Sequence, residues 1–332
     1  MTKKFNMPFV NCHTHASMIA FRGLAEDMTL DKWLNDCIWP KEAENVNQKF
    51  VYKNSLLAIK EMKKNNISIF ADMYFFEMET ARACEKLKMH AVLGEGILDF
   101  KTPSAENSEK ALKITRKLLE KYKNNQYIKI SVCPHSIYTV SKKTLIKAKE
   151  LAKKYNSIYH IHLSETKKEF DDCVKKNKCT PVEYLNNLNI LDNMTLLAHC
   201  VYLTDNDIKI LAEKKVNVCH CPLSNLKLGS GIAPISKMID AGINVCLGTD
   251  GPASSNRLDI LEAGKFAGLL QKGITNDASV LPGKLILEMM SVNGLKALHI
   301  NEINGKTIKH IQRQIDEMKD YSFIYNLNIN EL

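Results

Sequence analysis

The sequence predicts a TIM-type (β/α)8 barrel, an α/β fold in which each of eight parallel strands leads into a helix. Eight short runs rich in β-forming residues alternate with amphipathic helical stretches, the pattern of repeated β–α units. The length of 332 residues, 45% of them apolar, is enough for one large barrel with a buried core. A doubly wound sheet is the alternative. It usually has fewer strands and often a glycine-rich phosphate loop, and neither GxGxxG nor GxxxxGK[ST] occurs in this chain.

The eight expected strands follow one another along the first 250 residues. Between them, helical periodicity is clear. In the stretch 141–155, Leu145, Ala148 and Leu151 recur on one face behind a Ser141 N-cap, and a similar helix begins at Thr204. The strands are FVNCH (from residue 9), ISIFADMY (67), AVLGEGIL (91), IKISVCPH (128), SIYHIHLSE (157), TLLAHCV (195), NVCHCPL (217) and NVCLGTD (244).

Two parts of unequal size are expected. Residues 1–300 form the barrel, and residues 301–332 form a C-terminal helix followed by a strand-like segment, DYSFIYNL (320–327). The stretch PGKLILEMMSVNGLKAL (282–298) is expected to be one further helix. No internal repeat, low-complexity segment or Pro/Gly/Ser-rich linker divides the chain.

Charge and hydropathy narrow the classes of partner. The formal net charge is +9, yet only five residues are arginine (22, 82, 116, 257 and 313), the residue type that reads bases and phosphates in a bidentate way. Lysine-rich runs such as CVKKNKC (173–179) fit solvated helix surfaces, so nucleic-acid binding is not expected. An uninterrupted apolar stretch of about 18 residues and an apolar leader are both absent from the sequence, so we expect no membrane association and a cytoplasmic location.

Histidines gather where the expected strands end, which is where chemistry takes place in this fold. Side chains two apart on a strand face the same side, so His13 and His15 can hold one ion. Each residue alone has an ordinary interpretation, a core histidine or, for an aspartate, a helix N-cap. Together they predict a metal site, because buried charges must be paired or bind something. From the first strand to the eighth, these residues are His13, His15, His135, His160, His162, Glu165, His199, His220 and Asp250.

A catalytic divalent ion needs three or four nitrogen or oxygen ligands and an open position for water. We expect the chain to bind one such ion through three histidines and one aspartate. His160 faces the same side of its strand as His162 and competes for the ligand role. His162 is preferred because Glu165 follows it by three residues and can place a carboxylate beside the water. Zn²⁺ is the expected ion, and Fe²⁺ or Mn²⁺ also suits this ligand set. The expected ligands are His13, His15, His162 and Asp250.

Five motifs resemble the amidohydrolase superfamily and, within it, the 5'-methylthioadenosine/S-adenosylhomocysteine (5'-deoxyadenosine) deaminase group. They are VNCHTHASMIAFRGLAEDMTLDKWL, IHLSET, AHCVYLTDNDI, HCPLSN and LGTDGPASSN, in the order of the family between about residue 8 and about residue 300. The resemblance implies the same four ligands and hydrolysis of an adenine nucleoside to its inosine analogue and ammonia. It also implies that Glu165 carries a proton to the purine ring and that His199 orients the attacking water. Asp250 can then accept the proton of that water.

The resemblance further implies which side chains contact the substrate. Trp33 would lie near the 5' substituent, Glu42 against the ribose hydroxyls, and His135 and Ser254 along the pocket. The alternatives from the residues alone are a half-buried core tryptophan, a glutamate on a helix surface, and turn residues at strand ends.

This chain departs from the family pattern at the third strand. Some members that accept S-adenosylhomocysteine carry arginines at and shortly after the end of that strand, suited to grip a carboxylate. This chain has Glu95 there and no arginine between Arg82 and Arg116. We therefore expect a substrate with a small or neutral 5' group, such as 5'-deoxyadenosine or 5'-methylthioadenosine.

Family members also carry a small β-sandwich built from segments before and after the barrel. Here the first strand begins by residue 9, so we expect this accessory sandwich to be largely missing, with 320–327 as a remnant. Apolar barrel surface that the sandwich would cover is then available for contact with a second copy, and a homo-oligomer is compatible with the sequence.

Two other functions remain open at this point. One is an aminohydrolase of another substrate, namely aminofutalosine, guanine, a pterin or a triazine. Glu42 favours a nucleoside over a free base, because ribose hydroxyls need an acceptor. The other is a catalytically silent barrel that acts as a binding protein. The joint presence of the four ligands with Glu165 and His199 argues against it, since such a protein needs no metal site.

Overall fold

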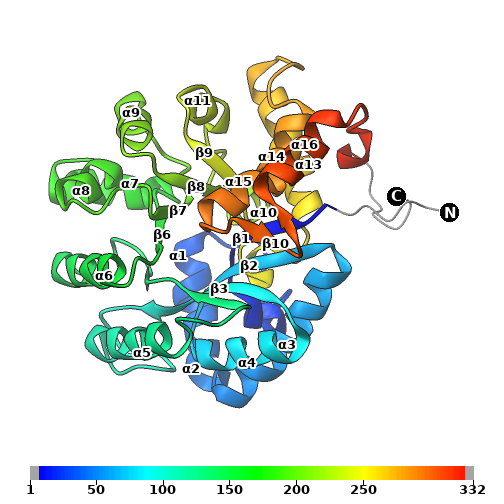
Figure 1. The fold of residues 1–332 in the computed structure, drawn as a ribbon. Coiled ribbons are helices and arrows are strands. Elements are labelled where there is room, and N and C mark those ends of the chain that lie inside the picture. The colour runs from blue at the N-terminus through cyan, green and yellow to red at the C-terminus, as the bar shows by residue number, and fades with distance from the viewer. Residues whose placement is uncertain (1–6, 326–332) are drawn as a thin grey trace.

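Eight parallel strand units form the centre of the molecule, and helices surround them (Figure 1). The computed structural model describes residues 7–325. All eight predicted strands are present, and the fourth is divided into two short pieces, which confirms the (β/α)8 prediction. The strands are β1 (Phe9–Thr14), β2 (Ile67–Tyr74), β3 (His90–Ile97), β4 (Ile128–Ile130) with β5 (Cys133–Pro134), β6 (Tyr159–Leu163), β7 (Thr195–His199), β8 (Asn217–His220) and β9 (Asn244–Leu247).

The strands pair as two parallel sheets that contact each other on both sides. One has the order β1-β2-β3-β4, with β5 on β3, and the other has the order β6-β7-β8-β9. On either side of β5, isolated parallel bridges join Val132 to Tyr159 and Ser136 to His162 of β6. At the other seam the backbone N–H of Asp250 donates to the carbonyl of His13 at 2.9 Å. A Cβ at Gly248 would lie 2.9 Å from that of His13, so only glycine permits this close approach.

Helices cover the outer surface of the strands (Figure 1). The two predicted N-caps are present: the hydroxyl of Ser141 accepts the Thr144 N–H at 3.4 Å, and that of Thr204 accepts the Asp207 N–H at 3.1 Å. The helices between the strands and after the last one are α3 (Gln48–Lys64), α4 (Glu77–Leu87), α5 (Ser108–Lys121), α6 (Lys142–Lys154), α7 (Lys167–Asn177), α8 (Pro181–Asn187), α9 (Asp205–Glu213), α11 (Ile235–Asp240) and α13 (Ile260–Thr275).

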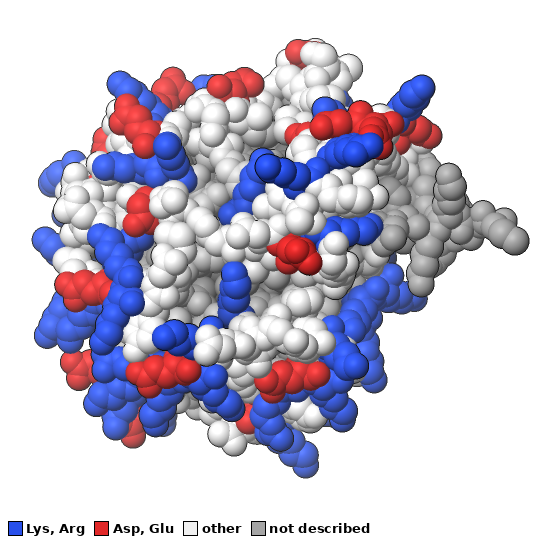
Figure 2. Space-filling view, in the orientation of Figure 1, with Lys and Arg blue, Asp and Glu red and all other residues white. Residues whose placement is uncertain are grey.

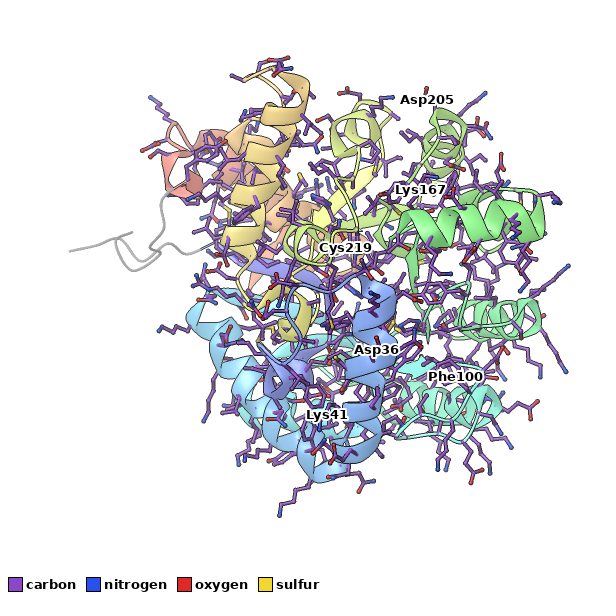
Figure 3. All side chains as sticks on the ribbon, turned by 180° about the vertical axis from the view of Figure 1, so that it is seen from behind. Asp36, Lys41, Phe100, Lys167, Asp205 and Cys219 are labelled. Carbon is purple, nitrogen blue, oxygen red and sulfur yellow. The ribbon has the colours of Figure 1, made fainter. Side chains whose placement is uncertain are left out.

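Short helices surround the carboxyl ends of the strands. The segment from α1 to α2 lies in front of the barrel in Figure 3, where Asp36 and Lys41 mark it. Its middle part is a π-helix, a wide turn that is frequent at functional sites. A second apolar cluster, separate from the main core, joins this segment to the ends of β2 and β3. These helices are η1 (Ala16–Phe21), α1 (Leu30–Lys32), η2 (Trp33–Ile38), α2 (Trp39–Asn45), α10 (Pro222–Lys227) and α12 (Pro252–Ser255).

The single helix predicted over 282–298 is wrong, because the structure has two helices there, α14 (Gly283–Met290) and α15 (Val292–Ala297). Ser291 separates them with φ −135° and ψ −86°, and its hydroxyl donates to the Leu287 carbonyl at 2.5 Å. A serine that bonds back to the preceding turn bends a helix. The change of direction lets α15 pack on β1.

The last described segment also differs from the prediction. A hairpin of β10 (Glu302–Ile303) and β11 (Lys306–Thr307) precedes the predicted C-terminal helix, α16 (Ile308–Glu317). The strand predicted over 320–327 is instead a 3-10 helix, η3 (Ser322–Tyr325), and 326–327 lie outside the described residues. The adjacent Phe323 and Ile324 are both buried, whereas a strand would send neighbouring side chains to opposite faces.

Two findings concern the surface and the membrane. On the face shown in Figure 2, lysine and arginine side chains are spread around the rim and mixed with acidic ones. Within residues 7–325, every helix is too short or too polar to cross a membrane.

Candidate active site

The four predicted metal ligands meet at the carboxyl ends of three strands. His13 belongs to β1, His15 follows it directly, His162 lies in β6, and Asp250 follows β9. Oδ1 of Asp250 is 3.1 Å from Nε2 of His15 and 3.4 Å from Nε2 of His13. Nε2 of His162 is 3.4 Å from Nε2 of His15. Nε2 of His15 therefore lies within 3.4 Å of both the Asp250 carboxylate and the His162 imidazole.

Backbone carbonyls orient two of these imidazoles. Nδ1 of His15 donates to the Met73 carbonyl at 2.5 Å, and Nδ1 of His162 donates to the His135 carbonyl at 2.7 Å. A carbonyl oxygen only accepts, so the proton of each contact lies on Nδ1. Each neutral ring therefore presents the Nε2 lone pair, as a metal ligand does.

Asp250 is held by groups that leave one of its oxygens for the histidines. Its Oδ2 accepts from the hydroxyls of Ser224 at 2.5 Å and Ser254 at 2.9 Å. Its Oδ1 accepts the Gly251 N–H at 2.7 Å and faces His13 and His15. The backbone φ of Asp250 is 61°, a left-handed conformation that is costly for a residue with a side chain and is often found at functional sites.

The charge balance favours a cation beside this carboxylate. Burial opposes ionisation of Asp250, but the close contacts and charges of His13 and His15 hold its pKa well below the usual range. Burial likewise opposes a charge on His15, yet the hydrogen bond and charge of Asp250 raise its pKa to about 9. For His13, burial prevails and lowers the pKa to about 4. A divalent cation can take the place of the proton on His15.

Unpartnered nitrogens support the fit to a metal ion. Nε2 of His13 and Nε2 of His199 are buried without a hydrogen-bond partner. Buried polar atoms are nearly always paired, so such an atom at a convergent cluster indicates that something binds there. His13 also groups with His162 and His199, and with His15 and Asp250, at spacings that can hold an ion. The residues therefore fit a divalent ion with nitrogen and oxygen ligands.

Glu165 and His199 lie next to the predicted ligands. Oε2 of Glu165 is 3.7 Å from Nε2 of His199. Nδ1 of His199 donates to the amide oxygen of Asn225 at 2.8 Å, which points Nε2 into the site. Burial raises the pKa of Glu165, and a carboxyl group that retains its proton more readily suits a proton carrier.

A pocket opens above these residues. Of the ten predicted site residues, nine line it, and only His13 lies deeper, with no exposed surface. Most other wall residues are apolar or aromatic and come from the α1–α2 segment and from the ends of β2 and β3. Among the residues that the structure describes, no lysine or arginine lines the pocket. Its walls thus suit an uncharged, flat ligand.

The four predicted substrate contacts occupy different parts of the pocket. Glu42 is 5% exposed, so the alternative of a surface glutamate is wrong; burial raises its pKa to about 7, and it lies beside the Tyr74 hydroxyl. Trp33 is 4% exposed, and its indole nitrogen has no hydrogen-bond partner. Nδ1 of His135 is bonded to the Thr139 hydroxyl at 3.0 Å. Ser254 donates to Asp250, as described above.

The other two histidines at strand ends do not reach the pocket. Nε2 of His160 lies 3.0 Å from Nδ1 of His13, on the opposite side of that ring from Nε2, which faces Asp250. His162, in contrast, lies in the pocket with its Nε2 3.4 Å from that of His15. His220 is 1% exposed, and neither of its ring nitrogens has a hydrogen-bond partner.

Sequence reasoning missed the side chains that hold the functional residues. Ser224 and Asn225 fix Asp250 and His199, and both belong to the HCPLSN motif, so a signal was present. Tyr74, beside Glu42, ends a strand in which nothing marks it from the neighbouring aromatic residues.

A barrel that gathers three histidines and an aspartate where its strands end has the architecture of a metal-dependent hydrolase. Comparison of sequences identifies the family of this hydrolase. The chain belongs to the amidohydrolase family, whose model matches residues 8–306.

Relatives with assigned names are similar over most of the chain. A 5-methylthioadenosine/S-adenosylhomocysteine deaminase from Thermodesulfovibrio yellowstonii is 46% identical, over 90% of this chain and 68% of that one. A 5'-deoxyadenosine deaminase from Methanosphaera stadtmanae is 45% identical, over 90% of this chain and 71% of the relative. Among solved structures, an adenosine deaminase from Xanthomonas campestris with bound zinc superposes with a TM-score of 0.88 at 33% identity, covering 91% of this chain and 69% of the other.

Proposed function

We propose that this protein is a metal-dependent deaminase that hydrolyses 5'-modified adenosines, such as 5'-deoxyadenosine or 5'-methylthioadenosine, to the inosine analogue and ammonia. The observation that carries the proposal is the placement of three of the four proposed ligands, Glu165 and His199 in one pocket with the buried carboxylate of Glu42, while His13 lies deeper and 3.4 Å from Asp250. The names of the relatives support the same reaction and substrate class.

His13, His15, His162 and Asp250 would hold one divalent ion. When bound, the ion acts as a Lewis acid that makes a water molecule nucleophilic near neutral pH. We propose Zn²⁺, the ion in the Xanthomonas campestris relative, while the same donor set also suits Fe²⁺ or Mn²⁺.

The proton transfers are assigned to three side chains. Nε2 of His199, whose Nδ1 is bonded to Asn225, accepts a hydrogen bond from the attacking water and orients it. Oδ1 of Asp250 accepts the proton of that water, and Glu165 gives its proton to N1 of the purine, which makes C6 electrophilic. Asp250 then returns its proton to the departing amino group, and the hydroxyl group at C6 gives its proton back to Glu165 as the carbonyl of the product forms. One water is consumed, and one ammonia is released.

The residues that line the pocket indicate which kind of 5' substituent the substrate carries. No lysine or arginine is among the described residues that line this pocket, so a carboxylate inside it has no cation to pair with, whereas lysines do line the neighbouring hollow that shares Leu34 and Tyr138 with it. The side chains of Leu34, Trp39 and Leu98 suit a hydrogen, a methyl or a methylthio group instead. The substrate class is therefore an adenosine with a small, neutral 5' group.

A comparison of kcat/KM across nucleosides tests this function. We expect 5'-deoxyadenosine and 5'-methylthioadenosine to be turned over at least about tenfold more efficiently than S-adenosylhomocysteine, since a buried unpaired carboxylate is costly. A strong preference for S-adenosylhomocysteine would contradict the 5' assignment while leaving the deaminase assignment intact.

Two alternatives predict different results in the same assay. An aminohydrolase of guanine, a pterin, a triazine or aminofutalosine would turn over that substrate in preference to adenosines. A silent barrel would release no ammonia from any of them. The buried position of Glu42 favours a riboside, because this carboxylate can accept hydrogen bonds from ribose hydroxyls. Glu42→Gln should therefore reduce kcat/KM for 5'-deoxyadenosine more than for free adenine.

A further inference from the structure

His160 is a buried histidine to which the proposed reaction gives no task. It is 1% exposed and lies outside the pocket. Its Nε2 is 3.0 Å from Nδ1 of His13, and the two rings meet edge to face with centroids 4.9 Å apart. Its own Nδ1 is buried without a hydrogen-bond partner. The side chain is thus directed at a proposed metal ligand from behind.

His13 differs from the other two histidine ligands in the group that orients it. His15 and His162 each donate Nδ1–H to a main-chain carbonyl, of Met73 and His135 respectively. A carbonyl cannot donate, so it allows only the tautomer with a free Nε2. His13 has a second imidazole in that place. An imidazole can either donate or accept, so the tautomer of His13 depends on that of His160.

One hydrogen lies between the two rings, because nitrogens 3.0 Å apart in this geometry share a hydrogen bond. If His13 owns it, a neutral His13 has a free lone pair on Nε2, the atom that faces Asp250. If His160 owns it, a neutral His13 carries its proton on Nε2 and directs it at Oδ1 of Asp250, 3.4 Å away. The second arrangement blocks coordination.

We propose that His160 is a positioning residue that fixes the coordinating tautomer of His13. Its Nε2 accepts the Nδ1–H of His13, its own proton lies on Nδ1, and Nε2 of His13 is left for the divalent ion. The inference rests on the proposed metal site and goes beyond the reaction, because it makes metal affinity depend on a residue that touches neither the ion nor the substrate. Groups that orient metal ligands in this way change metal affinity strongly when they are removed.

The test is the affinity of the metal-stripped, full-length protein for Zn²⁺, measured by competition with a chelator. His160→Leu removes the acceptor and should weaken binding by about 10- to 100-fold. His160→Gln keeps an acceptor oxygen near the same place and should bind within about threefold of the parent protein, as a retained hydrogen bond requires. His220→Leu is the matched control, since His220 is equally buried and neither of its ring nitrogens has a partner.

A second readout reports the tautomer directly. In the zinc-loaded protein labelled with ¹⁵N-histidine, we expect His13 to carry its proton on Nδ1, and we expect this resonance to shift in His160→Gln. Zinc affinity unchanged in His160→Leu, or a proton on Nε2 of His13, would overturn the inference. If His160→Leu does not fold, the zinc affinity of His160→Gln and the position of the proton on His13 still test the inference. A parent protein that binds no Zn²⁺ would instead overturn the metal site and the proposed function.

Discussion

At the scale of single residues, Glu165 carries the clearest functional expectation. It lies 3.7 Å from His199 in the pocket, and its raised pKa, caused by burial, suits a group that donates a proton to the purine. Glu165→Gln keeps the shape of the side chain but cannot transfer a proton. We expect kcat to fall by about 10²- to 10⁴-fold while metal content stays the same. Steady-state kinetics and elemental analysis check this, and activity within threefold of the parent would remove Glu165 from the mechanism.

The raised pKa of Glu42 predicts that substrate binding depends on pH. Burial raises its pKa to about 7, against the effects of the neighbouring Tyr74 and His15. Below that pH the group is protonated and is a poorer acceptor for ribose hydroxyls, so KM for 5'-deoxyadenosine should rise as the pH falls from 8 to 6. Glu42→Gln should have a high KM with little change over this range. An identical pH profile of KM in both proteins would contradict the assignment.

The same pKa shift has a consequence for stability. A carboxyl group whose folded-state pKa is raised destabilises the folded protein as the pH rises above its unfolded value, until the folded pKa is passed. The window for Glu42 is therefore from the ordinary glutamate value to about 7. Glu42→Gln should accordingly raise Tm relative to the parent more at pH 8 than at pH 5.

At the scale of elements, the strands could be predicted from the sequence better than the helical segments that follow and surround them. Strand ends such as His13 and Asp250 could be located because period-two patterns and neighbouring turns mark them. The break at Ser291 and the helix at Ser322–Tyr325 depend on long-range packing, which a local pattern does not contain. The π-helix that places Trp33 in the pocket is also set by contacts with β2 and β3.

Long-range contacts likewise distinguish the two histidines of β6 as candidate ligands. His160 and His162 have the same sequence features, and only the distance between His160 and His13 distinguishes them. Of the two serines that hold Asp250, Ser224 is 26 residues away from it in the chain, so spacing alone does not reveal that contact.

The packing of α15 on β1 yields a matched pair of predictions. A methyl group at Gly294 would lie 2.7 Å from Cβ of Val10, an atom fixed to the backbone of β1. We expect Gly294→Ala to lower the free energy of unfolding by about 1 to 3 kcal/mol, as overpacking does. Gly273→Ala, in α13, meets nothing within 4 Å and should stabilise by up to about 1 kcal/mol. Denaturant unfolding measures both, and a stable Gly294→Ala would show that α15 can move.

At the scale of the whole molecule, the proposed metal site joins the two sheets. His13 and His15 belong to the β1 side, whereas His162 and Asp250 belong to the sheet of β6 to β9. An ion that binds only the folded protein stabilises it by about 4 kcal/mol at 1,000 times its Kd. A strong chelator should therefore lower Tm by several degrees, and Zn²⁺ should restore it. Equal Tm values with and without the ion would show that the ion does not link the sheets.

The central claim is that ions bound at these strand ends support the deamination of a 5'-modified adenosine. The most direct measurement is ammonia release from 5'-deoxyadenosine by metal-stripped protein to which Zn²⁺ is returned in steps. We expect ammonia and 5'-deoxyinosine in equal amounts, at a rate that rises in proportion to the occupied sites up to one ion per chain. Full occupancy without ammonia release, or equal rates at zero and full occupancy, would contradict the account.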